Sequence, residues 1–376
     1  MNIFTLTMTP INPPHDDAAK NIVLDVAKRL KDRRFFFISS FFDRDFTHED
    51  NIYFFRSPFQ RTGKHKMPRF QKLYAALCIL VNIRNIEVLQ FFVTPQPYFS
   101  RFFRWLIKKT SKKSIQIIPS IYTLQNKNEA EDIPGLFFGD NVVVYSDFTR
   151  DKLKGMGVRN VTRIYPGIDT GKFSEGHERR EDDTFKVLYP GTYKTLRNAY
   201  SFQKFIAIVH KVMEAMENVN FVMACRIRTK EDIVLEAGFK EACEGSGVLG
   251  NFTFLNTIED MPSLFRSCDL GIMPMCRATG GVLEIPMVLL EAASSFKPVI
   301  YGNVPPMSEL SDRSLGIMLS DSSPESYADQ IIQLLRDREA ARLVGSRSRK
   351  AVLEHFNVDD MADRYEELYR SLERSS

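Results

Sequence analysis

Short apolar runs alternate with amphipathic segments along the chain, and this alternation constrains the fold more than any other sequence feature. In the first half, the runs at 2–8, 35–39 and 86–93 have the length and the apolar content of buried strands. Segments between them, such as 70–82, place apolar residues at helical spacing. Strands that alternate with helices predict an α/β protein with a parallel, doubly wound sheet.

The alternation stops once and then resumes, which divides the chain into two similar halves. The interruption at 166–183 holds glycines and charged residues without an apolar period, so we predict a linker there. Ligands of such sheets bind beyond the carboxyl ends of the strands, and two sheets that face each other would surround one cleft. The sequence therefore predicts two Rossmann-like domains, 1–175 and 176–357.

Charge is distributed unevenly between these halves. The 376 residues carry a net charge of +4, but residues 1–180 hold 29 basic and 18 acidic groups, whereas the remainder holds 22 and 29. Between residues 51 and 120 the one acidic residue is Glu87. We therefore expect the first half to meet an anionic surface. A nucleic acid is not the expected partner, because the basic stretch contains no recognition motif.

The composition also indicates the compartment. Five cysteines are scattered without a Cys-x-x-Cys pair, which fits a reducing cytosol and gives no zinc site. The apolar run at 73–81 is far shorter than the roughly 20 residues of a spanning helix, and the N-terminus lacks a basic segment typical of signal peptides. We expect a cytoplasmic protein, peripheral on the inner face of the membrane.

Residues 142–173 carry the most specific motif. A strand-like run, Ser146, a short helical segment and a second strand lead into Tyr-Pro-Gly-Ile-Asp-Thr-x-x-Phe, which ends at Phe173. This segment resembles the hinge of glycosyltransferase family 4, the glycosyl transferases of group 1. The resemblance covers about residues 140–376 and extends to the first half only in layout. It implies a retaining enzyme of the two-domain GT-B fold, with the C-terminal helix, 358–376, crossing back to the first domain.

Residues 187–198 provide a second motif. A strand ends at Gly191, a loop with two cations follows, and a helix is expected to begin at Asn198. A helix N-terminus with two cations beside it suits a diphosphate, whose charge grows as it leaves. In the family an Arg follows the glycine, where this chain has Thr192, and a Lys stands at the position of Arg197. The implied donor-binding residues are Gly191, Thr192, Lys194 and Arg197, and both cations are also candidate catalytic residues.

Residues 269–300 resemble the donor loop and helix of the same family. The family pattern has two glutamates separated by seven residues, and Glu291 matches the second, which holds the nucleotide ribose. The first would fall at Leu283, but the acid in this chain is Glu284, one place later. We carry Glu284 over as a catalytic residue that contacts the donor sugar. Flexible glycines allow a backbone to approach a sugar or phosphate closely, which adds three donor-binding candidates: Thr279, Gly280 and Gly281.

The segment 101–113 combines an apolar and a basic face. On a helical wheel Phe103 and Leu106 share one side, whereas Trp105 lies among the cations. A basic amphipathic helix with an exposed aromatic side chain is typical of an anionic lipid surface. The candidate membrane residues are Arg101, Arg104, Trp105, Lys108, Lys109 and Lys112.

The first half gives weaker candidates for acceptor binding. His15, Asp16 and Gln125 lie where family members often carry glycines or histidines at strand ends. The sequence 43–45 is an Asp-x-Asp, which binds a metal in another glycosyltransferase fold, but nothing around it supports a single-sheet nucleotide domain. No metal or other cofactor is therefore expected.

Together these features favour a retaining glycosyltransferase that moves a sugar from a nucleotide-diphosphate sugar to a carbohydrate or lipid-linked acceptor. The second domain would bind the donor, and the basic first domain would bind the acceptor, such as a cell-envelope glycan. Two alternatives remain open. One is a nucleotide-sugar epimerase or hydrolase of the same fold, and the other is a non-catalytic sugar-nucleotide or membrane-surface binding protein with a decayed site.

Overall fold

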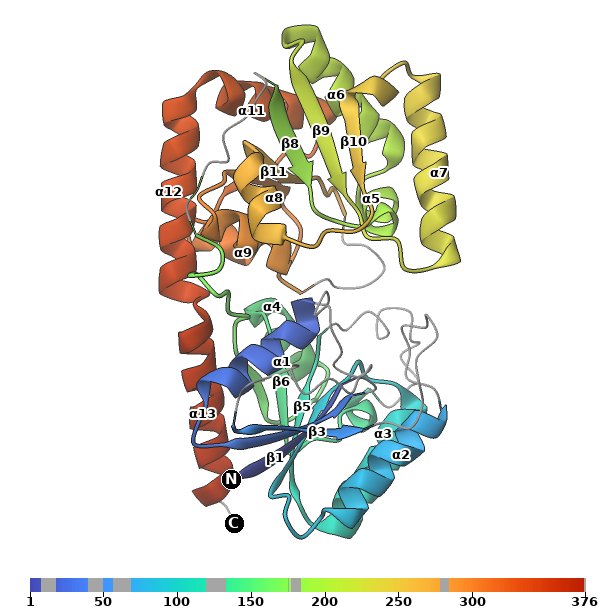
Figure 1. Cartoon of the computed structure of the whole chain (residues 1–376), viewed down its shortest axis with the longest axis vertical. Coiled ribbons are helices and arrows are strands. Elements are labelled where there is room, and N and C mark those ends of the chain that lie inside the picture. The colour runs from blue at the N-terminus through green and yellow to red at the C-terminus, as the bar shows by residue number, and fades with distance from the viewer. Residues whose placement is uncertain are drawn as a thin grey trace. The chain divides into compact units, whose positions relative to one another are not determined.

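Two parallel sheets organise the chain into two units (Figure 1). The computed structural model describes residues 1–7, 18–39, 50–56, 69–119, 133–174, 176, 184–277 and 284–374. Unit 1 comprises Met1–Gly167 together with Val358–Ser376, and unit 2 comprises Ile168–Asn357.

Unit 1 is built on a seven-stranded parallel sheet in the order β3-β2-β1-β4-β5-β6-β7. The strand order reverses between β1 and β4. The connection that follows β1 therefore crosses one face of the sheet, and the connection that follows β4 crosses the other. The strands are β1 (Asn2–Thr7), β2 (Arg34–Ser39), β3 (Ile52–Arg56), β4 (Val88–Phe92), β5 (Lys113–Ile117), β6 (Asn141–Val144) and β7 (Val161–Arg163).

The helices of unit 1 cover both faces of this sheet. Because parallel crossovers are right-handed, α1 lies on one face, and α2 and α3 lie together on the other. Phe103 of α3 stacks against Phe91 of β4 at 4.7 Å between ring centroids, and Ile79 of α2 joins the same buried cluster. The helices are α1 (Ala18–Arg29), α2 (Arg69–Val81), α3 (Pro97–Thr110), α4 (Asp147–Gly155) and α13 (Val358–Arg374), with a 3-10 turn η3 (Pro134–Leu136).

The C-terminal helix α13 packs beside α1 in unit 1 (Figure 1). Arg33 donates to Glu366 at 2.8 Å and pairs with Glu373, and Tyr369 donates its hydroxyl to Oε1 of Gln90 in β4 at 2.6 Å. Tyr369 and Gln90 are both buried. A buried hydrogen bond therefore joins α13 to the central strand β4 of the unit 1 sheet.

Unit 2 is built on a six-stranded parallel sheet in the order β10-β9-β8-β11-β12-β13, with the reversal between β8 and β11. Its strands are β8 (Phe185–Tyr189), β9 (Val219–Ala224), β10 (Phe252–Leu255), β11 (Leu270–Met273), β12 (Val299–Gly302) and β13 (Ile317–Leu319). Its helices are α5 (Tyr193–Ala199), α6 (Phe202–Ala215), α7 (Lys230–Gly245), α8 (Met261–Ser267), α9 (Met287–Ser294), α10 (Ser308–Asp312), α11 (Pro324–Arg336) and α12 (Arg338–His355), with a 3-10 turn η4 (Leu249–Asn251).

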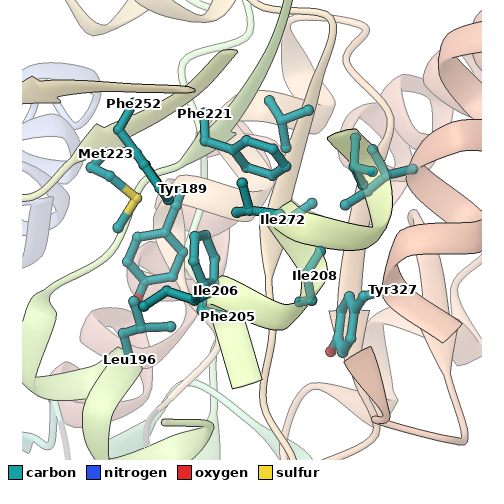
Figure 2. Packing of buried hydrophobic residues seen from close by; sticks show 14 of the residues in the cluster. Tyr189, Leu196, Phe205, Ile206, Ile208, Phe221, Met223, Phe252, Ile272 and Tyr327 are labelled. Carbon is teal, nitrogen blue, oxygen red and sulfur yellow. The ribbon is translucent and has the colours of Figure 1, made fainter. Parts of the chain in front are cut away.

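Aromatic rings fill the core of unit 2 beneath β8. The ring of Tyr189 meets that of Phe205 edge to face at 5.7 Å, and Phe205 in turn contacts Phe221 at 6.1 Å (Figure 2). All three side chains are buried, and edge-to-face pairs add to the apolar area that such residues remove from water. This packing fixes the strand from which the first part of the candidate site emerges.

The predicted α/β architecture of two doubly wound parallel sheets is confirmed. One predicted helix end is wrong. The helix expected to run to residue 113 ends at Thr110, because Ser111 adopts a left-handed conformation (φ 51°) and Lys113 already begins β5. The apolar periodicity alone does not predict this helix end, because lysines stand on both sides of it, at 108–109 and 112–113.

We expect Tyr369→Phe to destabilise unit 1 by about 1–3 kcal/mol, because it leaves the buried carbonyl oxygen of Gln90 without its donor. Urea unfolding followed by circular dichroism measures this change. Tyr98→Phe is the control, since it removes the same hydroxyl from a side chain that is 92% exposed. An equal effect of the two substitutions would contradict the prediction.

Candidate functional site

The loop after β8 is fixed by the core below it. The hydroxyl of Tyr189 donates to the carbonyl oxygen of Thr192 at 3.1 Å. A Cβ at Gly191 would clash with that same hydroxyl and with the ring that carries it, which is buried. The chain therefore requires glycine at Gly191, and the turn brings Thr192 to the start of α5.

Thr192 corrects the expected position of the following helix. Its Oγ1 accepts a hydrogen bond from the backbone N–H of Thr195 at 3.0 Å, which caps α5. The helix therefore begins at Tyr193 and not at Asn198, as the sequence predicted. As a result, Lys194 and Arg197 lie on a helix and not in a loop.

The structure brings the two predicted cations together on one face of α5. Residues three apart on a helix are neighbours, and both side chains extend towards Glu231 in the first turn of α7. The Nζ of Lys194 lies 3.1 Å from Oε2 of Glu231, and Nη2 of Arg197 lies 4.0 Å from Oε1. All three side chains are about half exposed.

Glu291 lies on α9 and is partly buried. Burial raises its pKa to about 7, and the positive charges of Lys172 and Arg226 act in the opposite direction. Its carboxyl group is therefore easily protonated near neutral pH. The structure adds Lys172 and Arg226 to the surroundings of a predicted site residue.

Sequence reasoning missed both of these cations. Arg226 follows Cys225 directly after the end of β9, so the rule that ligands bind at strand carboxyl ends was a usable signal. Lys172 falls within the segment that was interpreted as a linker. Lys172 is itself exposed, and no local pattern marks it as a neighbour of Glu291, because that proximity depends on tertiary contacts.

Those contacts centre on Arg349 of α12. Its guanidinium donates to the carbonyl oxygens of Phe173 and Ser294 at 2.8 Å each, and to that of Thr170 at 3.0 Å. The hydroxyl of Ser294, at the end of α9, also donates to the carbonyl oxygen of Phe173 at 2.7 Å. The segment that carries Lys172 is thus held against the helix that carries Glu291.

Glu284 precedes α9 and is 8% exposed. The N-cap of that helix is Pro286, so Glu284 lies outside the helix and does not cap it. Several other predicted residues lie outside the part of the chain that the structure describes: the donor-loop residues Thr279, Gly280 and Gly281, the acceptor candidates His15, Asp16 and Gln125, and the Asp-x-Asp at 43–45.

The basic helix α3 buries one face and exposes the other. Phe103 and Leu106 are fully buried, whereas Trp105 is 52% exposed. Arg104 donates to the carbonyl oxygen of Gly135 in η3. The side chains of Arg101, Lys108 and Lys109 are exposed, and that of Lys112 is partly buried.

Helix α2, on the same sheet face, presents exposed apolar side chains: Leu77, Leu80 and Val81. Within the described residues, no helix combines the length and the hydropathy needed to cross a bilayer.

Residues 184–337 match a family model described as Glycosyl transferases group 1. This region is therefore similar to the group 1 glycosyltransferases. It contains the two motifs that suggested the family in the second half of the sequence, so that resemblance is confirmed. The matched region runs from β8 to α11 of unit 2, including α5, α7 and α9, and ends before α12.

Relatives with established names are distant. The chain is 30% identical over 119 residues to N-acetyl-alpha-D-glucosaminyl L-malate synthase of Bacillus anthracis, which covers 31% of this chain and 29% of the relative. It is 24% identical over 253 residues to the GDP-mannose-dependent alpha-(1-6)-phosphatidylinositol monomannoside mannosyltransferase of Mycobacterium tuberculosis, 62% of either chain. The match thus spans less than two thirds of the length of either relative.

The fold of the chain recurs in a solved structure. Anabaena HepE, crystallised with UDP and glucose, superposes with a TM-score of 0.75 at 13% identity, over 98% of this chain and 99% of that one. Such a likeness shows the fold, and the predicted GT-B class is confirmed.

We expect Glu291→Gln to change thermal stability in a pH-dependent way. The pKa of Glu291 is raised from 4.5 to about 7 in the folded chain, so its stabilising contribution is complete below pH 4.5 and is lost as the pH rises through 7. Glutamine cannot ionise. The melting temperature of the variant relative to the wild type should therefore be higher at pH 8 than at pH 5, as measured by calorimetry.

The matched control is Glu241→Gln, which alters an exposed carboxylate on α7. Its melting temperature relative to the wild type should be the same at both values of pH. A difference for Glu291→Gln that does not vary with pH would show that burial does not govern this carboxyl group.

Proposed function

We propose that this protein is a retaining glycosyltransferase that moves a sugar from a nucleotide-diphosphate sugar to a carbohydrate or lipid-linked acceptor. The observation that carries the proposal is the pair of cations on α5, Lys194 and Arg197, at the carboxyl edge of a group 1 glycosyltransferase sheet. This edge is where the strand order reverses between β8 and β11, which is the usual ligand position in such sheets.

In this proposal the cations bind the diphosphate and stabilise the charge that grows on it as the glycosidic bond breaks. Glu291 binds the ribose, and Glu284, beside the donor loop, contacts the sugar. Gly191 and Thr192 bring the N-terminus of α5 to the phosphates, and Thr279, Gly280 and Gly281 complete the donor loop. The departing phosphate takes the acceptor proton, so no protein base is needed, and the two cations balance the diphosphate charge in place of a metal ion.

The base of the donor nucleotide has to be determined by experiment, because two similar proteins are associated with different bases. HepE was crystallised with UDP, and the mycobacterial relative is named as GDP-mannose-dependent. A thermal-shift series with UDP, GDP, ADP and their sugar conjugates, with and without EDTA, tests both. One nucleotide at a hundred times its dissociation constant should stabilise the protein by about 2.7 kcal/mol.

The stabilisation should not depend on EDTA and should be absent in Glu291→Ala. If no nucleotide stabilises the wild type, the donor site is wrong. If a nucleotide sugar is consumed without any acceptor, the protein is an epimerase or hydrolase and not a transferase. Retention is checked by NMR, since the anomeric carbon of the product should keep the configuration of the donor.

We expect Arg197→Gln to lower the transfer rate by about 100- to 1000-fold, because one electrostatic stabiliser of a developing anion is lost. The rate is measured as release of the nucleoside diphosphate. Lys350→Gln is the control, because it removes a charge from a side chain that is 74% exposed on α12. A rate unchanged in Arg197→Gln would remove this residue from the catalytic group.

We further propose that the acceptor is reached at a membrane surface on the inner face of the cytoplasmic membrane. The support comes from unit 1, where α2 and α3 lie on one sheet face and expose Leu77, Leu80, Val81, Tyr98 and Trp105. Cations flank these side chains on α3, and in the sequence between residues 69 and 119 the one acid is Glu87. This combination suits anionic lipid, with apolar side chains at the acyl boundary and cations at the headgroups.

The acceptor then binds to unit 1, with His15, Asp16 and Gln125 as the proposed contacts. A cell-envelope glycan on a lipid carrier fits such a surface. No nucleic acid is proposed as a partner.

We expect the double substitution Lys108→Gln/Lys109→Gln to weaken binding to anionic vesicles by roughly thirtyfold. Each cation near the surface contributes about 1 kcal/mol, and about 2 kcal/mol corresponds to that factor. Vesicle flotation with and without phosphatidylserine measures it. The control, Lys28→Gln/Lys31→Gln, removes one charge from α1, which lies on the opposite sheet face, and one from the turn that follows it. Equal binding by both variants and the wild type would rule out docking through α3.

A further inference from the structure

Glu231 is the counter-ion of both cations that the proposed function assigns to the diphosphate. One carboxylate oxygen lies 3.1 Å from Nζ of Lys194, and the other lies 4.0 Å from Nη2 of Arg197. The carboxylate thus bridges two residues of α5 from the first turn of α7.

Helix α7 does not need Glu231 for its own N-terminus. The neighbouring Asp232 forms a capping box with Thr229: Oδ2 of Asp232 accepts from the backbone N–H of Thr229 at 2.8 Å and from its hydroxyl at 2.8 Å. The same oxygen accepts from the N–H of Arg228 at 3.1 Å. With the helix end capped in this way, Glu231 extends to α5.

The packing of the two helices fixes this arrangement. The ring of Tyr193, the first residue of α5, contacts that of Phe239 on α7 at 5.8 Å, and both side chains are buried. The backbones on either side of the ion pairs are therefore held in place. The charged side chains themselves are 46% (Lys194), 47% (Arg197) and 52% (Glu231) exposed, so only side-chain rotation is required to separate them.

A carboxylate and a phosphate offer the same chemistry to a pair of cations, since each presents negatively charged oxygens. The two anions cannot both contact the same cationic nitrogens, so a diphosphate and Glu231 compete for Lys194 and Arg197. Exposed ion pairs contribute little free energy, and the contact is therefore readily exchanged.

We propose that Glu231 determines affinity and specificity for the donor as an internal competitor, which the diphosphate displaces from Lys194 and Arg197 and which returns when the nucleoside diphosphate leaves. This inference rests on the proposed function. It makes Glu231 a positioning residue that acts through the two cations and not a catalytic residue. It also predicts that ligands without phosphate are insensitive to Glu231.

The test is isothermal titration calorimetry of the full chain with UDP, GDP and ADP, and with the matching nucleosides. Glu231→Gln should tighten binding of the nucleoside diphosphate by about three- to fivefold, the size of an exposed ion pair. Binding of the nucleoside should not change. Glu241→Gln is the control, because it removes the same charge about 15 Å farther along α7, beyond the roughly 8 Å screening length at physiological salt.

A variant cycle shows whether Glu231 acts through the cations. In a Lys194→Gln/Arg197→Gln background, Glu231→Gln should have no effect on the affinity for the nucleoside diphosphate. Circular dichroism of each variant checks that it is folded.

The outcomes separate this inference from the proposed function. Binding of the nucleoside diphosphate that is equal in the wild type and in Glu231→Gln overturns the competition alone. Weaker binding in Glu231→Gln also overturns it, because Glu231 is then an anchor for the cations. If none of the three nucleoside diphosphates binds to either protein, the proposed function itself fails.

Discussion

The candidate donor site depends on the aromatic packing beneath β8. Tyr189 is held by Phe205 in the core, and its hydroxyl reaches the carbonyl oxygen of Thr192, the residue that caps α5. The same ring excludes any side chain at Gly191. The position of the cations on α5 therefore follows from buried apolar contacts. The cations do not create it, because their own exposed ion pairs are individually weak.

The candidate site contains two groups of charged side chains that differ in burial. One is exposed and can bind an anionic ligand, and the other contains a carboxyl group whose ionisation depends on pH. Lys194 and Arg197 share an exposed counter-ion, Glu231, so an anionic ligand can exchange with it. Glu291 is partly buried, and its pKa of about 7 reflects desolvation that Lys172 and Arg226 only partly offset. The first cluster is suited to binding phosphate. In the second cluster, the ionisation of Glu291, the candidate ribose-binding residue, depends on pH near neutrality.

Several elements could be predicted closely, and the errors have local causes. The predicted strand at 35–39 coincides with β2 to within one residue, and the alternation of strands and helices indicated the correct fold class. The predicted start of the helix at Asn198 was wrong, because the prediction followed the apolar residues after Asn198 and did not recognise Thr192 as the N-cap of α5. The end of α3 was missed because Ser111 adopts a left-handed conformation, for which the sequence offers no glycine as a signal. Each of these two helix ends is determined by the conformation of one residue and not by the apolar periodicity of the segment.

The sequence by itself determined the fold class and the positions of the family motifs, because apolar periodicity and short motifs are local properties of the chain. It also identified Lys194, Arg197 and Glu291 as candidates. Only the tertiary structure decided which charges meet. Glu231 lies 37 residues from Lys194 in the chain, and Arg349 lies 176 residues from the carbonyl of Phe173 that it binds. Such pairs depend on strand order and helix packing, which bring distant segments together, and no local pattern records them.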